Sequence, residues 1–455
     1  MLRLFRKKGG ATALFWRCRY FSHEAGGSNE SASLAVMSFG DGSQGALGLP
    51  SSLLGVGADS YEPTLVPGLP ADIVSVTAGH YHSLAVTGNG ELWAWGRNDE
   101  GQLGRGVLEP RLSWNEPRPV EGLANVKVRA AFASGVISAA VGDDGSVWTW
   151  GRSKRGQLGH RKGVLEALVP SRVEALAEED IVKVALGWGH ALAQTVDGKL
   201  FGWGYSADGR LGRLGEIVST VQLNSDSKLS GRHIMNSSEA LDAAEKLVTE
   251  SMDKEKDMPI IWEPQLVEEL EPVGVIDVCC GLDHSIVVCC DGTMLSGGNN
   301  IYGQLGRVKQ DVELLPIELD YRPRSVACGL GHSLAVCDMP TVDDDNNPRK
   351  IVISWGWNGS SQLGRSGPET RPVVVEGLLD EIPKAVSCGR VHSLVVTDNG
   401  ELWAWGCGKN GRLGLGSSFD EQEPTFVDIG CRRVVQAVAG FDHNLLLVAE
   451  SSGCL

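Results

Sequence analysis

Trp95-Gly96-Arg97-Asn98-Asp99-Glu100-Gly101-Gln102-Leu103-Gly104 decides the fold, because its pattern returns six more times along the chain. An aromatic residue and a glycine are followed by four variable residues and then by Gly-x-Leu-Gly. Gly297 replaces the aromatic residue in the fifth copy, and Ser361 replaces the first loop glycine in the sixth. Successive copies are 56, 55, 53, 94, 58 and 50 residues apart, which indicates a repeat array. The other copies lie at 39–48, 150–159, 203–212, 297–306, 355–364 and 405–414.

Each repeat has the same internal order. An apolar strand leads into a Gly-x-x-His turn, and a second strand follows it. An Asn-Gly or Asp-Gly pair then opens a hairpin to a third strand, and we expect this pair to supply the positive φ angles of a tight two-residue turn. After the Gly-rich loop, a short strand that begins with proline closes the unit, and proline suits an outer strand. These closing strands are expected at 63–66, 117–120, 264–267, 372–375 and 424–427.

Four strands per unit and seven units predict an all-β, seven-bladed β-propeller over residues 34–448. The strand at 34–39 has no hairpin partner before it, and the strand at 444–448 has no third strand after it. Pairing these two would close the ring and remove two open sheet edges. Residues 449–455 are then a C-terminal tail.

The long step of 94 residues holds about 40 extra residues within 214–258. Asn236-Ser237-Ser238-Glu239 is a capping box, so we expect this insertion to be partly helical. A second irregularity is an acidic loop at 341–349, in place of a tight turn.

Composition describes a turn-rich protein with 59 glycines and a formal charge of −16, and no apolar run is long enough to span a membrane. The acidic balance argues against a general electrostatic grip on nucleic acid, although a local basic patch is compatible with it. None of the 11 cysteines forms a Cys-x-x-Cys pair. Cys280, Cys328 and Cys388 occupy one repeat position, so we interpret them as small packing residues in a reduced protein rather than metal ligands.

Residues 1–21 hold six basic residues and no acid, which is typical of a mitochondrial transit peptide. Arg19, Phe21 and Ser22 form a candidate processing site, with arginine at the third position before the cut and cleavage after Phe21. Removal of this segment would leave a linker at 22–33 and a charge of −22. The alternative is a disordered basic tail. We expect mitochondrial localisation, in the matrix.

The combination of Trp-Gly-x-x-x-x-Gly-Gln-Leu-Gly with Gly-x-x-His-Ser-Leu resembles the repeat of the regulator of chromosome condensation family, over roughly residues 34–448. The resemblance implies the propeller fold, and it says less about function because function resides in sites carried by the fold. The whole pattern is most similar to plant mitochondrial members of this family. One departure is Ile137, which stands where the other units have the turn histidine.

The repeated histidines are interpreted as structural turn residues that bond neighbouring backbone, because six equivalents in one ring are poor candidates for catalysis. They are His82, His190, His284, His332, His392 and His443. Two Gly-x-Gly-x-x-Gly matches, at 40–45 and 406–411, do not open a helix and so fail the test for a dinucleotide site. No catalytic, cofactor or metal motif is found. The photoreceptor-type Gly-Trp-Arg-His-Thr cluster is approached only at 187–191, without the arginine.

Arginine follows Leu-Gly in four of the seven units, and His160 takes this place in a fifth. Rotational repetition would place these side chains around one face, where a cationic ring could bind phosphate, including an RNA backbone. The alternative is that each arginine bonds loop carbonyls or a local acid. The four candidates are Arg105, Arg213, Arg307 and Arg365.

These observations favour a non-enzymatic mitochondrial scaffold that presents loops to protein or ribonucleoprotein partners. The resemblance implies a role in processing or splicing organellar transcripts for respiratory complex I, although no aromatic-basic stacking platform is evident in the sequence. The alternative is guanine-nucleotide exchange on a small GTPase, the activity of the family's nuclear founder. Chromatin binding is disfavoured by the basic amino terminus and the acidic remainder. The sequence leaves the partner, its face and the role of the insertion open.

Overall fold

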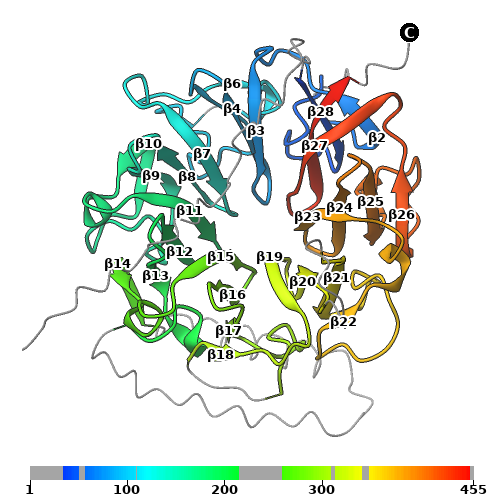
Figure 1. The fold of residues 1–455 in the computed structure, drawn as a ribbon. Coiled ribbons are helices and arrows are strands. Elements are labelled where there is room, and N and C mark those ends of the chain that lie inside the picture. The colour runs from blue at the N-terminus through cyan, green and yellow to red at the C-terminus, as the bar shows by residue number, and fades with distance from the viewer. Residues whose placement is uncertain are drawn as a thin grey trace, which may run out of the picture. The chain divides into compact units, whose positions relative to one another are not determined.

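The computed structural model describes residues 34–50, 57–108, 110–214, 259–308, 313–340 and 348–450. Within these residues, strands form seven four-stranded antiparallel sheets. Figure 1 shows the sheets as blades around a common axis, with β3, β7, β11, β15, β19, β23 and β27 innermost. The prediction of a seven-bladed all-β propeller is therefore confirmed. The transit peptide, the linker, the capping box of the insertion and most of the acidic loop lie outside the described residues.

We number the blades in chain order from the first complete one. Blades 1 to 3 comprise β3 (Ile73–Ala78), β4 (His82–Thr87), β5 (Leu92–Gly96), β6 (Arg118–Pro119); β7 (Val128–Ala133), β8 (Ile137–Gly142), β9 (Val147–Arg152), β10 (Glu166–Arg172); and β11 (Ile181–Leu186), β12 (His190–Thr195), β13 (Leu200–Tyr205), β14 (Ile260–Leu266). Blades 4 to 6 comprise β15 (Val275–Cys280), β16 (His284–Cys289), β17 (Met294–Gly298), β18 (Leu315–Pro316); β19 (Arg322–Cys328), β20 (His332–Asp338), β21 (Lys350–Gly356), β22 (Val373–Val374); and β23 (Pro383–Cys388), β24 (His392–Thr397), β25 (Leu402–Gly406), β26 (Glu421–Val427). Blade 7 comprises β27 (Arg432–Ala439), β28 (His443–Glu450), β1 (Leu34–Gly40) and β2 (Ser60–Leu65). Short 3-10 turns are η1 (Arg111–Ser113), η2 (Glu174–Leu176), η3 (Ala207–Gly209), η4 (Glu268–Leu270), η5 (Glu376–Leu378) and η6 (Lys409–Gly411).

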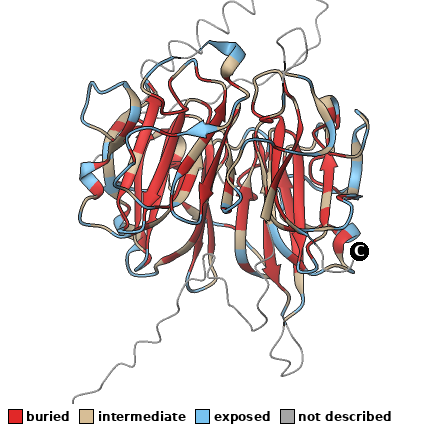
Figure 2. Ribbon diagram, turned by 90° about the horizontal axis from the view of Figure 1, so that it is seen from above, coloured by how far each residue is buried: buried red, intermediate tan, exposed pale blue. Residues whose placement is uncertain are grey.

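Blade 7 joins the two ends of the propeller. Its strand order is β2-β1-β28-β27, and β1 pairs with β28 from Leu34 opposite Ala449 to Gly40 opposite His443. The two unpaired strands of the sequence therefore complete one sheet, as expected, and β28 continues to Glu450, two residues beyond the expected end of the propeller. The second strand of blades 1 to 6 is buried along its whole length, and β28 of blade 7 is buried except at its last two residues. Figure 2 shows this buried layer within the blades.

The hairpin turns differ in detail from the expectation. In the Asn-Gly and Asp-Gly pairs only the glycine has a positive φ, as in Gly90 at 88°, whereas Asn89 does not. The amide of Gly90 donates to the carbonyl of Thr87, so the turn spans four residues and ends in a left-handed glycine. The closing strands do take the outer position of their sheets, where the missing N–H of proline is harmless.

Neighbouring blades are joined by a repeated chain of hydrogen bonds. At the first junction, His82 Nε2 lies 2.7 Å from Ser138 Oγ of the next blade, and Ser138 Oγ donates to the carbonyl of Gln102 at 2.8 Å. The same carbonyl accepts the indole N–H of Trp150 at 2.8 Å. One loop carbonyl of a blade therefore holds both the second and the third strand of the following blade.

The same histidine link recurs at five further junctions. In every case the histidine bonds the side chain of the residue that directly follows the equivalent position of the next blade. That residue is a serine except at the junction of blades 6 and 7, where it is Asn444, and Ser83 of blade 1 receives the bond that closes the ring. The pairs are His190–Ser285, His284–Ser333, His332–Ser393, His392–Asn444 and His443–Ser83, at 2.7–3.1 Å. We expected these histidines to bond neighbouring backbone, and this is wrong, because each imidazole Nε2 bonds a side chain of the next blade.

The chain of bonds also determines the state of the imidazoles. Because Ser138 has one hydroxyl hydrogen and gives it to a carbonyl, His82 must donate from Nε2, which assigns the neutral Nε2–H tautomer. Burial lowers the pKa of His82, His284, His332 and His392 to about 3 and that of His443 to about 4, since no water solvates a charged ring there. The glycine of Gly-x-x-His lies under the ring: a Cβ on Gly79 would come within 2.6 Å of His82 Cε1.

The junction between blades 2 and 3 lacks this link, and three residues differ together. Ile137 replaces the histidine, and Ala191 of blade 3 replaces the serine that the histidine would reach. Ser134 replaces the glycine that lies under the ring elsewhere. Both Ile137 and Ala191 are completely buried, so two apolar side chains replace the polar pair and neither leaves a polar group unpaired.

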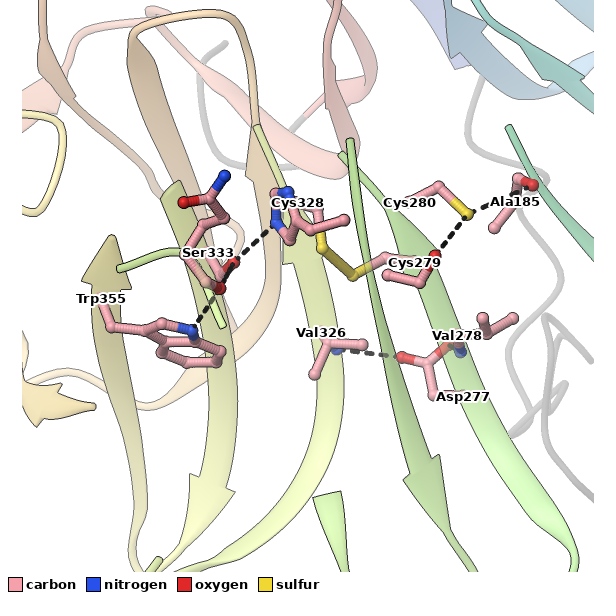
Figure 3. Close-up of a disulfide and its surroundings, with 12 residues drawn as sticks. Ala185, Asp277, Val278, Cys279, Cys280, Val326, Cys328, Ser333 and Trp355 are labelled. Atoms are coloured by element: carbon pink, nitrogen blue, oxygen red, sulfur yellow. Dashed lines mark hydrogen bonds between the residues drawn. A yellow bond between two sulfur atoms is a disulfide. The ribbon is translucent and has the colours of Figure 1, made fainter. Parts of the chain in front are cut away.

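A disulfide joins the innermost strands of blades 4 and 5. Cys279 of β15 is bonded to Cys328 of β19, while Cys280 points to the opposite side, toward the carbonyl of Ala185 in β11 (Figure 3). Strand alternation therefore places the neighbouring side chains of Cys279 and Cys280 on opposite sides of β15. The expectation of a free thiol is wrong for Cys328, whereas Cys280 and Cys388 are free, and burial raises the pKa of Cys280 to about 12.

Lowering the pH should destabilise the propeller through the buried histidines. Their folded pKa values lie below the unfolded value of 6.5, so the unfolded chain binds more protons once the pH falls below about 6.5. Each such histidine should lower the free energy of unfolding by about 0.8 kcal/mol per pH unit on average between about pH 7 and 5.5, and by up to about 1.4 kcal/mol per pH unit well below pH 6.5. Urea unfolding between about pH 7 and 5.5, above the isoelectric point near 5.1, measures this slope.

The control is His332→Gln, which keeps an N–H donor and does not titrate. Its slope between about pH 7 and 5.5 should be smaller than that of the wild type by about 0.8 kcal/mol per pH unit. Equal slopes, or stability that does not change with pH in this range, would contradict the assignment.

Ser361→Gly should stabilise the protein. Ser361 has a φ of 62°, a conformation that costs a residue with a Cβ about 1–2 kcal/mol, and the equivalent residue in the other copies is glycine. Part of this gain is offset by the backbone entropy of glycine, which leaves an increase of about 0.5–1 kcal/mol. The matched control is Ser360→Gly. The φ angle of Ser360 is not positive, so this substitution should be neutral or destabilising in the same denaturation experiment.

Candidate functional site: the loop face of the propeller

The two faces of the propeller carry different connections. One face carries the turns between first and second strands, such as 79–81, and the long loops between third and fourth strands, such as 97–117. We call it the loop face. The opposite face carries the hairpin turns, such as 88–90, and the connections between blades, and we call it the turn face.

The arginines that follow Leu-Gly are mostly bound to their own blades. Arg105 is buried and donates to the carbonyls of Ala94 and Glu116, at 2.6 and 3.0 Å. Arg307 is buried too and donates to Ser296 through both its hydroxyl and its carbonyl.

The other two arginines differ in exposure. Arg365 donates to the Ser354 hydroxyl and carbonyl and to loop carbonyls, and burial lowers its pKa to about 10. Arg213 is exposed and paired with Glu313. His160 lies 3.2 Å from the Thr149 hydroxyl, and burial lowers its pKa. This geometry agrees with the alternative in which each arginine satisfies loop carbonyls or a local acid. Phosphate binding by the four arginines remains a prediction.

The other sequence-based candidates add no chemical centre. The six histidines are buried in the blade junctions, and none of them lines the axial cavity described below. Arg19, Phe21 and Ser22 lie outside the described residues. Among the residues that the structure describes, no group of three or more His, Cys, Asp or Glu is placed to hold a metal ion, and no helix is long and apolar enough to cross a membrane.

At the axis, the loop face carries an aromatic stack that sequence reasoning missed. The His80 ring stacks on Phe441, with centroids 4.5 Å apart, and on Trp188, with centroids 5.4 Å apart. Tyr81 meets Phe441 edge-on at 5.6 Å. His80 and Phe441 also line an axial cavity of about 120 Å³, bounded by turns from all seven blades. Burial lowers the pKa of His80 to about 4, so the stack is uncharged near neutral pH.

Arginines surround this axial stack. Arg390 lies over Phe441 at 4.9 Å, and Arg155 lies over Trp188 at 5.1 Å. Arg97 lies over Tyr81 at 5.7 Å and pairs with Asp99 and Glu100. His80, Trp188 and Phe441 all occupy the same repeat position, directly after the glycine of a Gly-x-x-His turn. Reading that position across the blades would have revealed the stack, because rotational repetition places these residues at the axis.

Two ion pairs made by buried arginines reinforce the loop face between blades. Arg210 replaces the glutamine of Gly-Gln-Leu-Gly in blade 3 and bonds Asp283 of blade 4 at 2.8 Å. Arg412 does the same in blade 6 and bonds Asp442 of blade 7 at 3.0 Å. The arginine occurs in the two blades that precede a Gly-x-Asp-His turn, so this pairing was readable from the sequence. Burial raises the pKa of Asp442, although Arg412 and Arg390 favour its carboxylate.

The long loops of the loop face also expose large apolar side chains. Ile301 is 77% exposed and Phe419 is 78% exposed. Large apolar side chains that gather on one exposed surface are typical of interaction sites. Together with the aromatic stack and its arginines, they give a surface with the residue types of protein–protein hot spots. The further members are Val107, Leu108, Leu112, Val164, Leu165, Tyr302 and Val308. This arrangement is suited to binding a partner and contains no paired nucleophile and base.

The sequence profile of the RCC1-like domain family matches residues 35–446. The ultraviolet-B receptor UVR8 of Arabidopsis thaliana is 31% identical over 411 residues, which cover 89% of this chain and 80% of the receptor. The mitochondrial RCC1 domain-containing protein RUG3 of the same plant is 29% identical over 459 residues, which cover 93% of this chain and 90% of RUG3. The human regulator of chromosome condensation is 26% identical over 422 residues, which cover 91% and 90%.

Solved structures agree on the fold. The crystal structure of Prp20p from Saccharomyces cerevisiae superposes with a TM-score of 0.72 at 22% identity, over 93% of each chain. Human WBSCR16 superposes with a TM-score of 0.70 at 22% identity, over 93% of this chain and all of that structure. With the repeat, the ring closure and the family profile in agreement, the chain belongs to the RCC1-like domain family of β-propellers.

Proposed function

We propose that this chain is a non-enzymatic scaffold of the mitochondrial matrix that supports processing or splicing of organellar transcripts, including those for respiratory complex I, by holding protein or ribonucleoprotein partners on its loop face. The observation that carries this proposal is the contrast between a rigid, hydrogen-bonded ring and a loop face with exposed apolar side chains around an aromatic stack. Such a surface offers binding energy without a reacting group.

The location rests on two further observations. Residues 1–21 carry six basic residues and no acid, the composition of a mitochondrial presequence. One relative that is similar over 93% of this chain is named as mitochondrial. A presequence is removed on import, so the working form is the acidic remainder of the chain, for which chromatin is a poor partner.

Guanine-nucleotide exchange on a small GTPase is the second candidate. It is favoured by the similarity to the regulator of chromosome condensation over 91% of this chain and by the likeness to Prp20p, a protein described as binding Gsp1p and histones. Exchange would use the same kind of surface, because a propeller acts on a GTPase by contact and not through a reacting side chain.

Crosslinked affinity purification from mitochondria tests the scaffold role. The full chain is expressed, and RNA sequencing and mass spectrometry are run on one eluate, with and without ribonuclease. We expect intron-containing transcripts together with splicing factors. Ile301→Asp with Phe419→Asp should lower their recovery about tenfold or more, because a charge at each exposed apolar contact costs above about 1 kcal/mol of binding.

The matched control is Val196→Asp with Ile382→Asp on the turn face, where the side chains are also more than half exposed. This variant should recover the same partners as the wild type. Absence of the chain from mitochondria, or an eluate without specific transcripts, would contradict the scaffold. A small GTPase as the main ribonuclease-resistant partner would favour nucleotide exchange.

A further inference from the structure

A groove on the loop side of blades 2 and 3 brings cations and an indole together. It has a volume of about 310 Å³. Arg161 and Lys162 line it from the long loop of blade 2, and Ile260, Trp262 and Glu263 line it from the outer strand β14 of blade 3. The two walls are about 100 residues apart in sequence, so no local motif announces the groove.

The loop of blade 2 is strongly basic in an acidic protein. Five cations lie between residues 152 and 162, and no acid occurs before Glu166, in a chain whose formal charge is −16. Arg152 pairs with Glu166, and Arg155 lies against Trp188 and Tyr205. The exposed cations of the loop are Lys154, Arg161 and Lys162. None of these three forms an ion pair with any residue that the structure describes.

Planar side chains connect this groove to the axis. Trp188 of the axial stack lies under Arg155, and Arg155 lies over Tyr205 at 5.7 Å. Tyr205 is paired with Ile260 across the β13–β14 ladder, and Ile260 is a wall of the groove. A radial row of aromatic and cationic groups therefore runs from the axis to the outer strand, an arrangement that is not evident in the sequence.

We propose that this groove binds single-stranded RNA, with Arg161 and Lys162 contacting backbone phosphates and Trp262 stacking on a base. The inference rests on the proposed function and identifies where direct RNA contact would occur. Arg161 and Lys162, which have no ion-pair partner among the residues that the structure describes, lie beside the partly exposed indole of Trp262. They match the two requirements of single-strand binding, a positive track for phosphates and a face for stacking. Among the described residues that line the groove, Glu263 is the one carboxylate, so the two cations outnumber it there.

Fluorescence anisotropy with an RNA of about 12 nucleotides tests the groove. The full chain is titrated at several salt concentrations, so that affinity and its salt dependence are measured separately. Residues 1–21 are present in every variant, so their charge cancels in the comparison. A polyglutamate peptide, labelled in the same way, is the second probe and reports attraction to any acidic chain.

Phosphate contacts and base stacking should differ in how strongly their contribution to the affinity depends on salt. Arg161→Gln with Lys162→Gln should weaken binding and reduce the slope of log K against log salt by about 1.4, because each phosphate that a cation neutralises on a single strand contributes about 0.7 to this slope. Trp262→Ala should weaken binding about 5- to 150-fold, as expected for one stacked base, and leave the salt slope unchanged. Trp262→Phe should restore most of the affinity, and Glu263→Gln should tighten binding.

The matched control is Lys127→Gln with Lys384→Gln, two exposed lysines on the turn face, which should bind RNA as the wild type does. Groove variants with the affinity of this control would overturn the inference, as would a wild type that binds no RNA. A loss of polyglutamate binding with unchanged RNA binding would also overturn it and would identify an acidic protein surface as the occupant. If transcripts are still recovered from mitochondria with groove variants, the scaffold role stands and only the groove is refuted.

Discussion

The bond between a buried histidine of one blade and the serine, or in one case asparagine, of the next is the constraint on which the other features of this propeller depend. The blades are separate sheets, so backbone ladders stabilise each blade but do not join it to its neighbour. The histidine link joins them, and the serine passes its own hydrogen to a loop carbonyl of the preceding blade. Removing one partner would leave a buried polar group unpaired, which costs about 1–3 kcal/mol.

This link accounts for residues that the repeat pattern alone leaves unexplained. The glycine of Gly-x-x-His is needed because a Cβ would collide with the imidazole. The tryptophan of the loop motif shares the carbonyl that the serine uses. Because the ring is held from inside, the long loops can carry exposed apolar and cationic side chains beside the residues that anchor them, and the proposed functions depend on these exposed side chains.

The sequence was sufficient for the architecture, because strand periodicity, turn residues and the two unpaired terminal strands each reflect local physics. It also located the residues of the blade junctions, although the partner of each histidine required knowledge of the next blade's position. The arginine after Leu-Gly was misleading: its position in the ring could be inferred, but its burial against Ala94 or Ser296 depends on the side-chain path. The groove at Trp262 could not be predicted, since its walls meet only through the packing of two blades.

The most direct test of the central claim is to build the missing seventh link between blades 2 and 3. In a Ser134→Gly background, which makes room for the ring, Ile137→His and Ala191→Ser are introduced singly and together, and unfolding free energies are measured as a double-mutant cycle. We predict that each single change destabilises the protein and that the pair is coupled favourably by about 1 kcal/mol. A coupling energy of zero would contradict the claim that the histidine–serine bond joins the blades.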